Sequence, residues 1–105
     1  MMKFYGDYHT HSHHSDGRQS IREIAAAAQK RGVSEVAVTD HGPHAAVIGV
    51  KNAGTYIKIK NEVESINESH EYEVILFTGA EANIKSLQGD LDVPQEIIKQ
   101  LDLLI

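Results

Sequence analysis

The stretch that decides the fold is DYHTHSHHSDG, from Asp7 to Gly17, which holds four of the chain's seven histidines. His9 and His11 stand two residues apart, so at the end of a β-strand both imidazoles would lie on one face. Asp7 would share that face one step earlier, where it could accept a hydrogen bond from an imidazole. Asp16 follows in a Ser-Asp-Gly turn, which can return a carboxylate to the same place. The stretch therefore predicts a strand that ends in metal ligands.

Taken alone, a His-x-His pair is a short pattern that also occurs in polar loops without any ligand role. Two further motifs favour the metal site. TDHG at Thr39–Gly42 and GAEAN at Gly79–Asn83 each follow directly after an apolar run. Three strand-like segments, each followed by His, Asp or Glu, indicate a metal site at one end of a parallel barrel.

The three motifs resemble those of the PHP (polymerase and histidinol phosphatase) family of metal-dependent phosphoesterases. DYHTHSHHSDG is similar to its first motif, TDHG to its second and GAEAN to its third, and the resemblance covers essentially all 105 residues. The resemblance implies an α/β fold, namely the N-terminal portion of a distorted (β/α)7 TIM-like barrel with parallel strands and crossover helices. It also implies that the complete family site binds up to three divalent metal ions.

The same resemblance implies roles for five residues of this chain. His9 and His11 would bind one metal ion, and Glu81 would bridge two. His41 would help to hold a third ion, together with Asp16. A water molecule on the metal held by His9, His11 and Glu81 would be the catalytic group, so no protein nucleophile is required.

Histidine nitrogens combined with carboxylate oxygens suit Zn²⁺, Mn²⁺ or Fe²⁺, and ligand type alone does not choose among them. Asp7, Asp40 and His44 are further candidates, either as supports for the ligands or as substrate contacts; a plain surface histidine is an equally good interpretation of His44. His13 and His14 match no ligand role, and we expect them to face solvent or the mouth of the substrate site.

Ten basic and fifteen acidic residues give a net charge of −5, which argues against bulk attraction to nucleic acid or to anionic membranes. A small phosphorylated substrate stays open, because bound cations reverse the local sign. The chain has no cysteine, which excludes disulfides and thiolate zinc sites and favours the reducing cytoplasm. We find no signal peptide and no run of about 18 apolar residues, so we expect no membrane association.

Hydrophobic periodicity predicts alternating strands and helices, the pattern of an α/β protein. The expected strands are Lys3–His11, Glu35–Thr39, Val74–Phe77 and Asp102–Ile105, and the expected helices are Ser20–Arg31, Thr55–Glu68 and Pro94–Leu101. Ser20 and Glu23 form a capping-box pattern. The continuous apolar run of the third strand predicts burial on both faces. Between these elements, Pro43–Ala53 is expected to be a loop and Ile84–Asp92 a loop or short hairpin.

An α/β barrel typically needs about 250 residues, so we expect residues 1–105 to be a single PHP domain truncated at its C-terminal end. Its open edges would favour oligomerisation. Three functions are considered: a phosphoesterase acting on a small metabolite or nucleotide, a non-catalytic metal-binding remnant or regulatory domain, and a polymerase-associated nuclease module. We expect the segment alone to be weakly active or inactive, because a multi-metal site needs about eight ligands and the motifs supply fewer.

Overall fold

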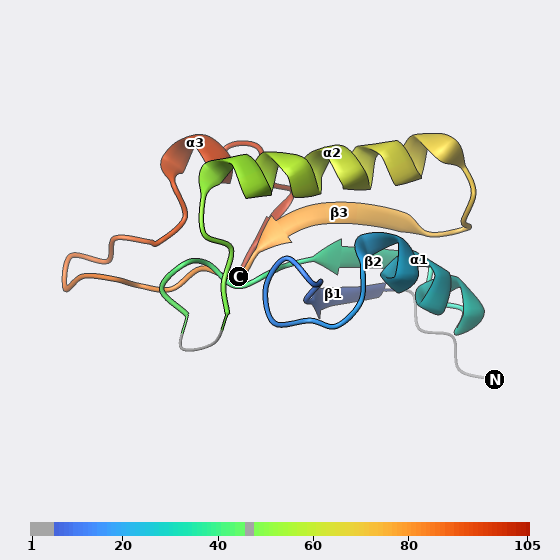
Figure 1. Cartoon of the computed structure of the whole chain (residues 1–105), viewed down its shortest axis with the longest axis horizontal. Coiled ribbons are helices and arrows are strands. Elements are labelled where there is room, and N and C mark those ends of the chain that lie inside the picture. Colours follow the sequence, from blue (N-terminus) through green and yellow to red (C-terminus); the bar gives the residue numbers. More distant parts are fainter. Residues whose placement is uncertain (1–5, 46–47) are drawn as a thin grey trace.

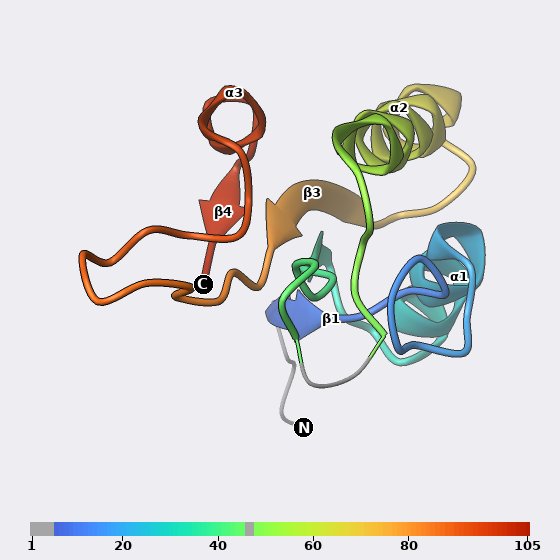
Figure 2. The same cartoon turned by 60° about the vertical axis from the view of Figure 1, so that its left-hand side comes forward.

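A computed structural model describes residues 6–45 and 48–105, which form four strands and three helices (Figure 1). The strands are β1 (Gly6–Thr10), β2 (Glu35–Val38), β3 (Ile75–Ala80) and β4 (Leu103–Leu104), and the helices are α1 (Ile21–Lys30), α2 (Ala53–Ser69) and α3 (Gln95–Ile98). The strands lie in the order β1-β2-β3-β4, and each neighbouring pair is parallel. This arrangement confirms the predicted α/β fold and forms a curled half of a parallel barrel (Figure 2).

The bounds of several elements differ from those predicted. β3 continues past Phe77 to Ala80, because its last residues pair with β4. α3 covers only Gln95–Ile98, since the next backbone hydrogen bonds join Gln100 to Ile97 and Leu101 to Ile98, the three-residue spacing of a tightening turn. The beginning of the first predicted strand, residues 3–5, lies outside the described residues.

Side-chain caps and apolar stripes account for α1 and α2. The hydroxyl of Ser20 accepts a hydrogen bond from the Glu23 N–H at 3.1 Å, and the Glu23 carboxylate accepts one from the Ser20 N–H at 3.0 Å, which confirms the capping box. Asn52 caps α2 by accepting from the Thr55 N–H at 2.9 Å. The stripe residues are all buried: Ile21, Ile24, Ala25 and Ala28 of α1, and Tyr56, Ile59, Val63 and Ile66 of α2.

The helices cover one face of the sheet and leave the other open (Figure 2). Val36 and Leu76 belong to the core that packs beneath the helices. On the opposite face of β3, Ile75 is 55% exposed and Phe77 is partly exposed. The prediction that this strand is buried on both faces is therefore wrong, because no described element packs over the second face. No helix in the described part of the chain is long and apolar enough to cross a membrane.

A register shift in β1 changes which of its side chains share a face. Across the β1–β2 pair, the Cα partners are Asp7 with Val36 and Thr10 with Val38. Because paired residues share a face, Asp7 and Thr10 point toward the same side, and His9 and His11, which flank Thr10, point to the other. The prediction that Asp7 shares a face with the two histidines is wrong. Asp7 instead accepts a hydrogen bond from the backbone N–H of His9 at 3.2 Å.

Candidate metal centre

Five polar side chains converge at the edge of the sheet where the strands end. His9 lies on β1 and His11 directly after it, while His41 and Glu81 follow β2 and β3 and Asp16 returns from the loop after β1. Among the described residues they form two sets of three whose ligand atoms all lie within 4.8 Å of one another. We call His9, His11 and Glu81 the first ligand group, and His11, Asp16 and His41 the second ligand group.

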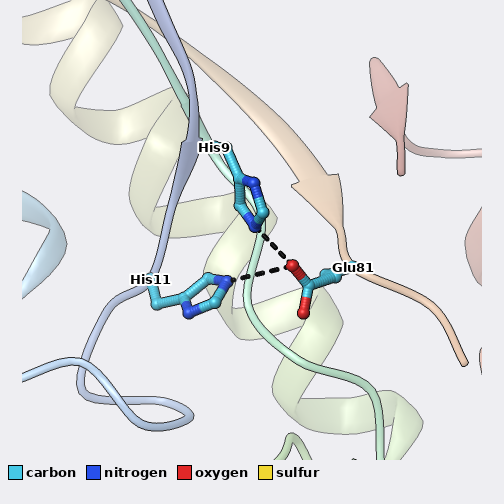
Figure 3. Close-up of side chains that lie close together, drawn as sticks. All are labelled: His9, His11 and Glu81. Atoms are coloured by element: carbon cyan, nitrogen blue, oxygen red, sulfur yellow. Dashed lines mark hydrogen bonds and ion pairs between the residues drawn. The ribbon is translucent and has the colours of Figure 1, made fainter.

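In the first ligand group, two imidazoles approach one carboxylate oxygen (Figure 3). His9 Nε2 contacts Glu81 Oε1, and His11 Nε2 lies 3.7 Å from the same oxygen. The side chain of His9 is 56% exposed, whereas those of His11 and Glu81 are 20% and 24% exposed. The group is therefore open to solvent on the side of His9 and enclosed on the side of His11.

In the second ligand group, Asp16 lies between two imidazoles. Asp16 Oδ1 is 2.8 Å from His11 Nδ1, and Oδ2 is 3.3 Å from His41 Nε2. Burial acts to raise the pKa of the Asp16 carboxyl, but the neighbouring His11 and His41 outweigh it and hold the pKa below its ordinary value. Asp16 is therefore a carboxylate at neutral pH.

Glu81 joins the two ligand groups. Its Oε1 faces His9 and His11, while its Oε2 lies 2.5 Å from His41 Nδ1. His11 and His41 thus each present one ring nitrogen to Asp16 and the other to Glu81. Both oxygens of one carboxylate are directed at different histidines, which is the arrangement that a ligand shared between two ions requires.

Two buried ring nitrogens, His11 Nε2 and His41 Nδ1, have no hydrogen-bond partner within the described part of the chain. His41 Nδ1 lies close to Glu81 without the alignment of a hydrogen bond. A buried polar atom without a partner costs about 1–3 kcal/mol, and a cation between the nitrogens and the carboxylate would remove that cost. Imidazole nitrogens with carboxylate oxygens suit Zn²⁺, Mn²⁺ or Fe²⁺. The residues present therefore fit a divalent metal ion.

Other predicted candidates lie near this edge but outside the two ligand groups. Asp40 is 1% exposed and accepts hydrogen bonds from the loop after β1, so its carboxylate is closed off from solvent. The side chain of His44 is exposed, and its backbone N–H donates to Asp92 Oδ2 at 2.9 Å. His13 is exposed, as expected. The expectation of a solvent-facing His14 is wrong, because its side chain is 7% exposed and lies 3.2 Å from Glu62 of α2.

Asp92 joins the segments that follow β2 and β3, through His44 and Asn83, and was missed in the sequence, where it stands in an ordinary polar loop. It is 6% exposed and accepts hydrogen bonds from the backbone and side-chain N–H groups of Asn83 and from the backbone of His44. Burial acts to raise the pKa of Asp92, but these hydrogen bonds outweigh it and hold the pKa below its ordinary value.

The segment Ile84–Asp92 was predicted to be either a loop or a short hairpin. Ile84 and Leu91 form an antiparallel bridge, so the segment is a short hairpin.

A parallel half-barrel with imidazoles and carboxylates gathered at the carboxyl ends of its strands has the arrangement in which parallel-barrel proteins place their active sites. The profile of the PHP domain family matches residues 7–102 of the chain. The chain therefore belongs to the PHP domain family, as its three motifs predict.

Curated relatives extend well beyond the length of this chain. It is 36% identical over 105 residues to a "Probable phosphatase" of Acetivibrio thermocellus, covering 99% of this chain and 41% of the relative. It is 35% identical over 102 residues to "Probable phosphatase PBPRB2022" of Photobacterium profundum, covering 96% and 39%. It is 35% identical over 100 residues to "DNA polymerase/3'-5' exonuclease PolX" of Bacillus subtilis, covering 95% and 17%.

Proposed function

We propose that this protein is a metal-dependent phosphoesterase that hydrolyses a phosphate ester of a small metabolite or nucleotide. The observation that carries the proposal is the convergence of the two ligand groups, with two buried ring nitrogens left unpartnered among the described residues. Membership of the PHP family and the relatives named as probable phosphatases support the same reaction class. Zn²⁺, Mn²⁺ and Fe²⁺ are the candidate ions.

The side chains of the two ligand groups would have different roles in holding cations. The first ligand group would hold one ion, Asp16 and His41 would hold another, and Glu81 would lie between them. Divalent cations held there would supply Lewis-acid chemistry, lowering the pKa of water and offsetting charge on phosphoryl oxygens. Imidazoles bind cations only through an unprotonated ring nitrogen, so metal binding at such a centre competes with protons.

The substrate would approach at the exposed His9 side of the centre. A hollow next to the His9–Glu81 pair is lined in part by Tyr8 and Ile105, and it gives a phosphate ester room beside the first ligand group. The exposed side chain of His44 is a further candidate to contact the phosphate. Burial of Asp40 favours a supporting role for that residue over a substrate contact.

Metal content tests the proposal directly. Purified protein should carry zinc, manganese or iron by elemental analysis, and the double variant His9→Ala with His11→Ala should lose most of it. His70→Asn is the matched control, because it removes an exposed imidazole at the C-cap of α2, where the left-handed backbone tolerates asparagine. Unchanged metal content in the double variant would refute the first ligand group.

Activity is tested with a generic phosphate monoester and added Mn²⁺ or Zn²⁺. We expect slow turnover by this chain, because the two ligand groups contain five side chains and a multi-metal site needs about eight ligands. Fast turnover by a monomeric 105-residue protein, abolished by His9→Ala, would show that further ligands are not required.

The similarity to PolX favours a second candidate, a nuclease module. A phosphate diester and a single-stranded oligonucleotide, assayed beside the monoester, separate the two. The net charge of −5 weakens attraction to nucleic acid, so we expect the monoester to be the better substrate. Preferential cleavage of the oligonucleotide would replace the first candidate with the second.

A further inference from the structure

Asp40 is a buried carboxylate that belongs to neither ligand group. It is 1% exposed and accepts three hydrogen bonds from the loop after β1. Oδ1 accepts from the Ser12 N–H and from the Ser15 hydroxyl, both at 2.6 Å, and Oδ2 accepts from the Ser12 hydroxyl at 2.7 Å. Hydrogen bonds to a charged acceptor are roughly twice as strong as neutral ones, so this carboxylate is a firm anchor for the loop.

The two anchored serines stand beside candidate metal ligands in the chain. Ser12 directly follows His11, and Ser15 directly precedes Asp16. Both serines are buried, at 0% and 5% exposure, so the hydrogen bonds to Asp40 are shielded from competing water. The anchor therefore fixes the backbone directly after His11 and directly before Asp16.

The loop after β1 folds tightly around the Asp40 carboxylate. The Ser12 carbonyl accepts hydrogen bonds from the N–H groups of Ser15 and Gly17 at 3.1 and 3.0 Å. A Cβ added at Gly17 would lie 2.1 Å from the His11 carbonyl oxygen, so the turn closes without room for a side chain. The Ser15 hydroxyl also accepts from the His41 N–H at 3.3 Å, which links the loop to the third member of the second ligand group.

We propose that Asp40 is a positioning residue for the second ligand group, which acts through Ser12 and Ser15 and touches neither cation nor substrate. This inference rests on the proposed function, because it presupposes metal binding. His9 lies on β1 and Glu81 directly after β3, both outside the anchored loop. The first ligand group therefore depends on Asp40 only through His11, which it shares with the second. Loss of the anchor should therefore weaken one metal site more than the other.

The experiment titrates the metal-free full chain with Mn²⁺ alone by calorimetry and measures the Tm of the same samples in EDTA. Asp40→Asn removes the charge and one acceptor oxygen. Ser15→Ala keeps the charge of Asp40. It removes the hydrogen bond to Asp40 Oδ1, together with the contacts of the Ser15 hydroxyl to the His41 N–H and to Asp16 Oδ1. Ile59→Val trims a buried side chain outside both ligand groups, so it reports what a loss of stability alone does to Mn²⁺ affinity.

We expect Asp40→Asn to weaken one Mn²⁺ site by about 10- to 100-fold, as substitutions beside metal ligands commonly do. Ser15→Ala should weaken the same site by a smaller factor, and Ile59→Val should lower Tm with affinity unchanged. Wild-type affinity in Asp40→Asn would overturn the inference. A loss of Mn²⁺ affinity in Asp40→Asn with no loss in Ser15→Ala would also overturn it, because the missing charge alone would then explain the change in affinity.

If Asp40→Asn does not fold, the Mn²⁺ affinity of Ser15→Ala decides by itself. A wild-type chain that binds no Mn²⁺ in this titration and carries no zinc, manganese or iron by elemental analysis would overturn the proposed function, and the inference with it.

Discussion

His41 and Glu81 face each other in a parallel bridge just beyond the ends of β2 and β3, with His41 Nδ1 2.5 Å from Glu81 Oε2. The bridge continues the register of the two strands, in which Val38 pairs with Thr78. The Gly42 N–H donates to the Glu81 carbonyl at 2.9 Å, and the Glu81 N–H donates to the carbonyl of residue 40 at 3.0 Å. Strand pairing itself therefore sets the distance between these two candidate ligands.

Glu81→Gln should weaken binding of Mn²⁺ at least about tenfold, equivalent to about 1.4 kcal/mol. Glu81 directs one oxygen at each set of histidines, and a neutral amide offers a cation less charge at both. Calorimetric titration of the metal-free chain measures the change. Glu68→Gln, an exposed position on α2, serves as the control for the loss of one negative charge. Equal affinities in Glu81→Gln and the wild type would contradict a ligand role.

Ile59→Ala should lower the free energy of unfolding by about 2–5 kcal/mol, because it leaves a cavity beneath α2. Ile59 is 2% exposed, whereas Ile57 on the same helix is 37% exposed. Ile57→Ala should therefore lower the free energy of unfolding by clearly less than Ile59→Ala. Urea unfolding of both variants gives the comparison, and a similar cost at the two positions would mean that α2 does not pack on the sheet as described.

Ser20→Ala should lower the free energy of unfolding by about 0.5–2 kcal/mol through loss of the capping box at the start of α1. The hydroxyl of Ser20 is the acceptor for the Glu23 N–H. Ser65→Ala, on an exposed position of α2, should change stability by no more than about 0.5 kcal/mol. Thermal unfolding in EDTA measures the stability of both variants. Equal stabilities of the two variants would contradict the capping role of Ser20.

Asp92→Asn should be most damaging near neutral pH. A carboxyl whose pKa is lowered in the folded state stabilises the fold above its ordinary pKa of about 3.9 and loses that effect as pH falls through the lowered pKa. Hydrogen bonds from Asn83 and His44 lower the pKa of Asp92 against the opposing effect of burial. The difference in unfolding free energy between wild type and variant should therefore shrink from pH 7 to pH 3. A difference that stays constant with pH would show that Asp92 is not held ionised.

The ligand-bearing edge could be predicted from the sequence to a large extent. An apolar run followed by His41 or by Glu81 marks the end of a buried strand, and parallel strands bring such ends together. All five candidate ligands accordingly lie in the two ligand groups. Their metal-binding role itself stays a prediction, which the titrations above test.

The sequence by itself also determined the two longer helices. The α1 cap joins Ser20 to Glu23, and the stripes that include Ile24 and Ile59 are buried as their spacing predicts. Caps involve groups within one turn, and a stripe repeats every three or four residues. Both can therefore be recognised in a short stretch of chain before any long-range contact is known.

Only the tertiary structure decided which side chains support the site. Asp7 faces away from His9 because the register of β1 shifts against β2. His14 is held by Glu62, and the buried Asp92 accepts from His44, and each of these pairs is 48 residues apart in the chain. Strand register and contacts between distant segments depend on how whole elements pack together, so no local pattern around Asp7, His14 or Asp92 could determine them.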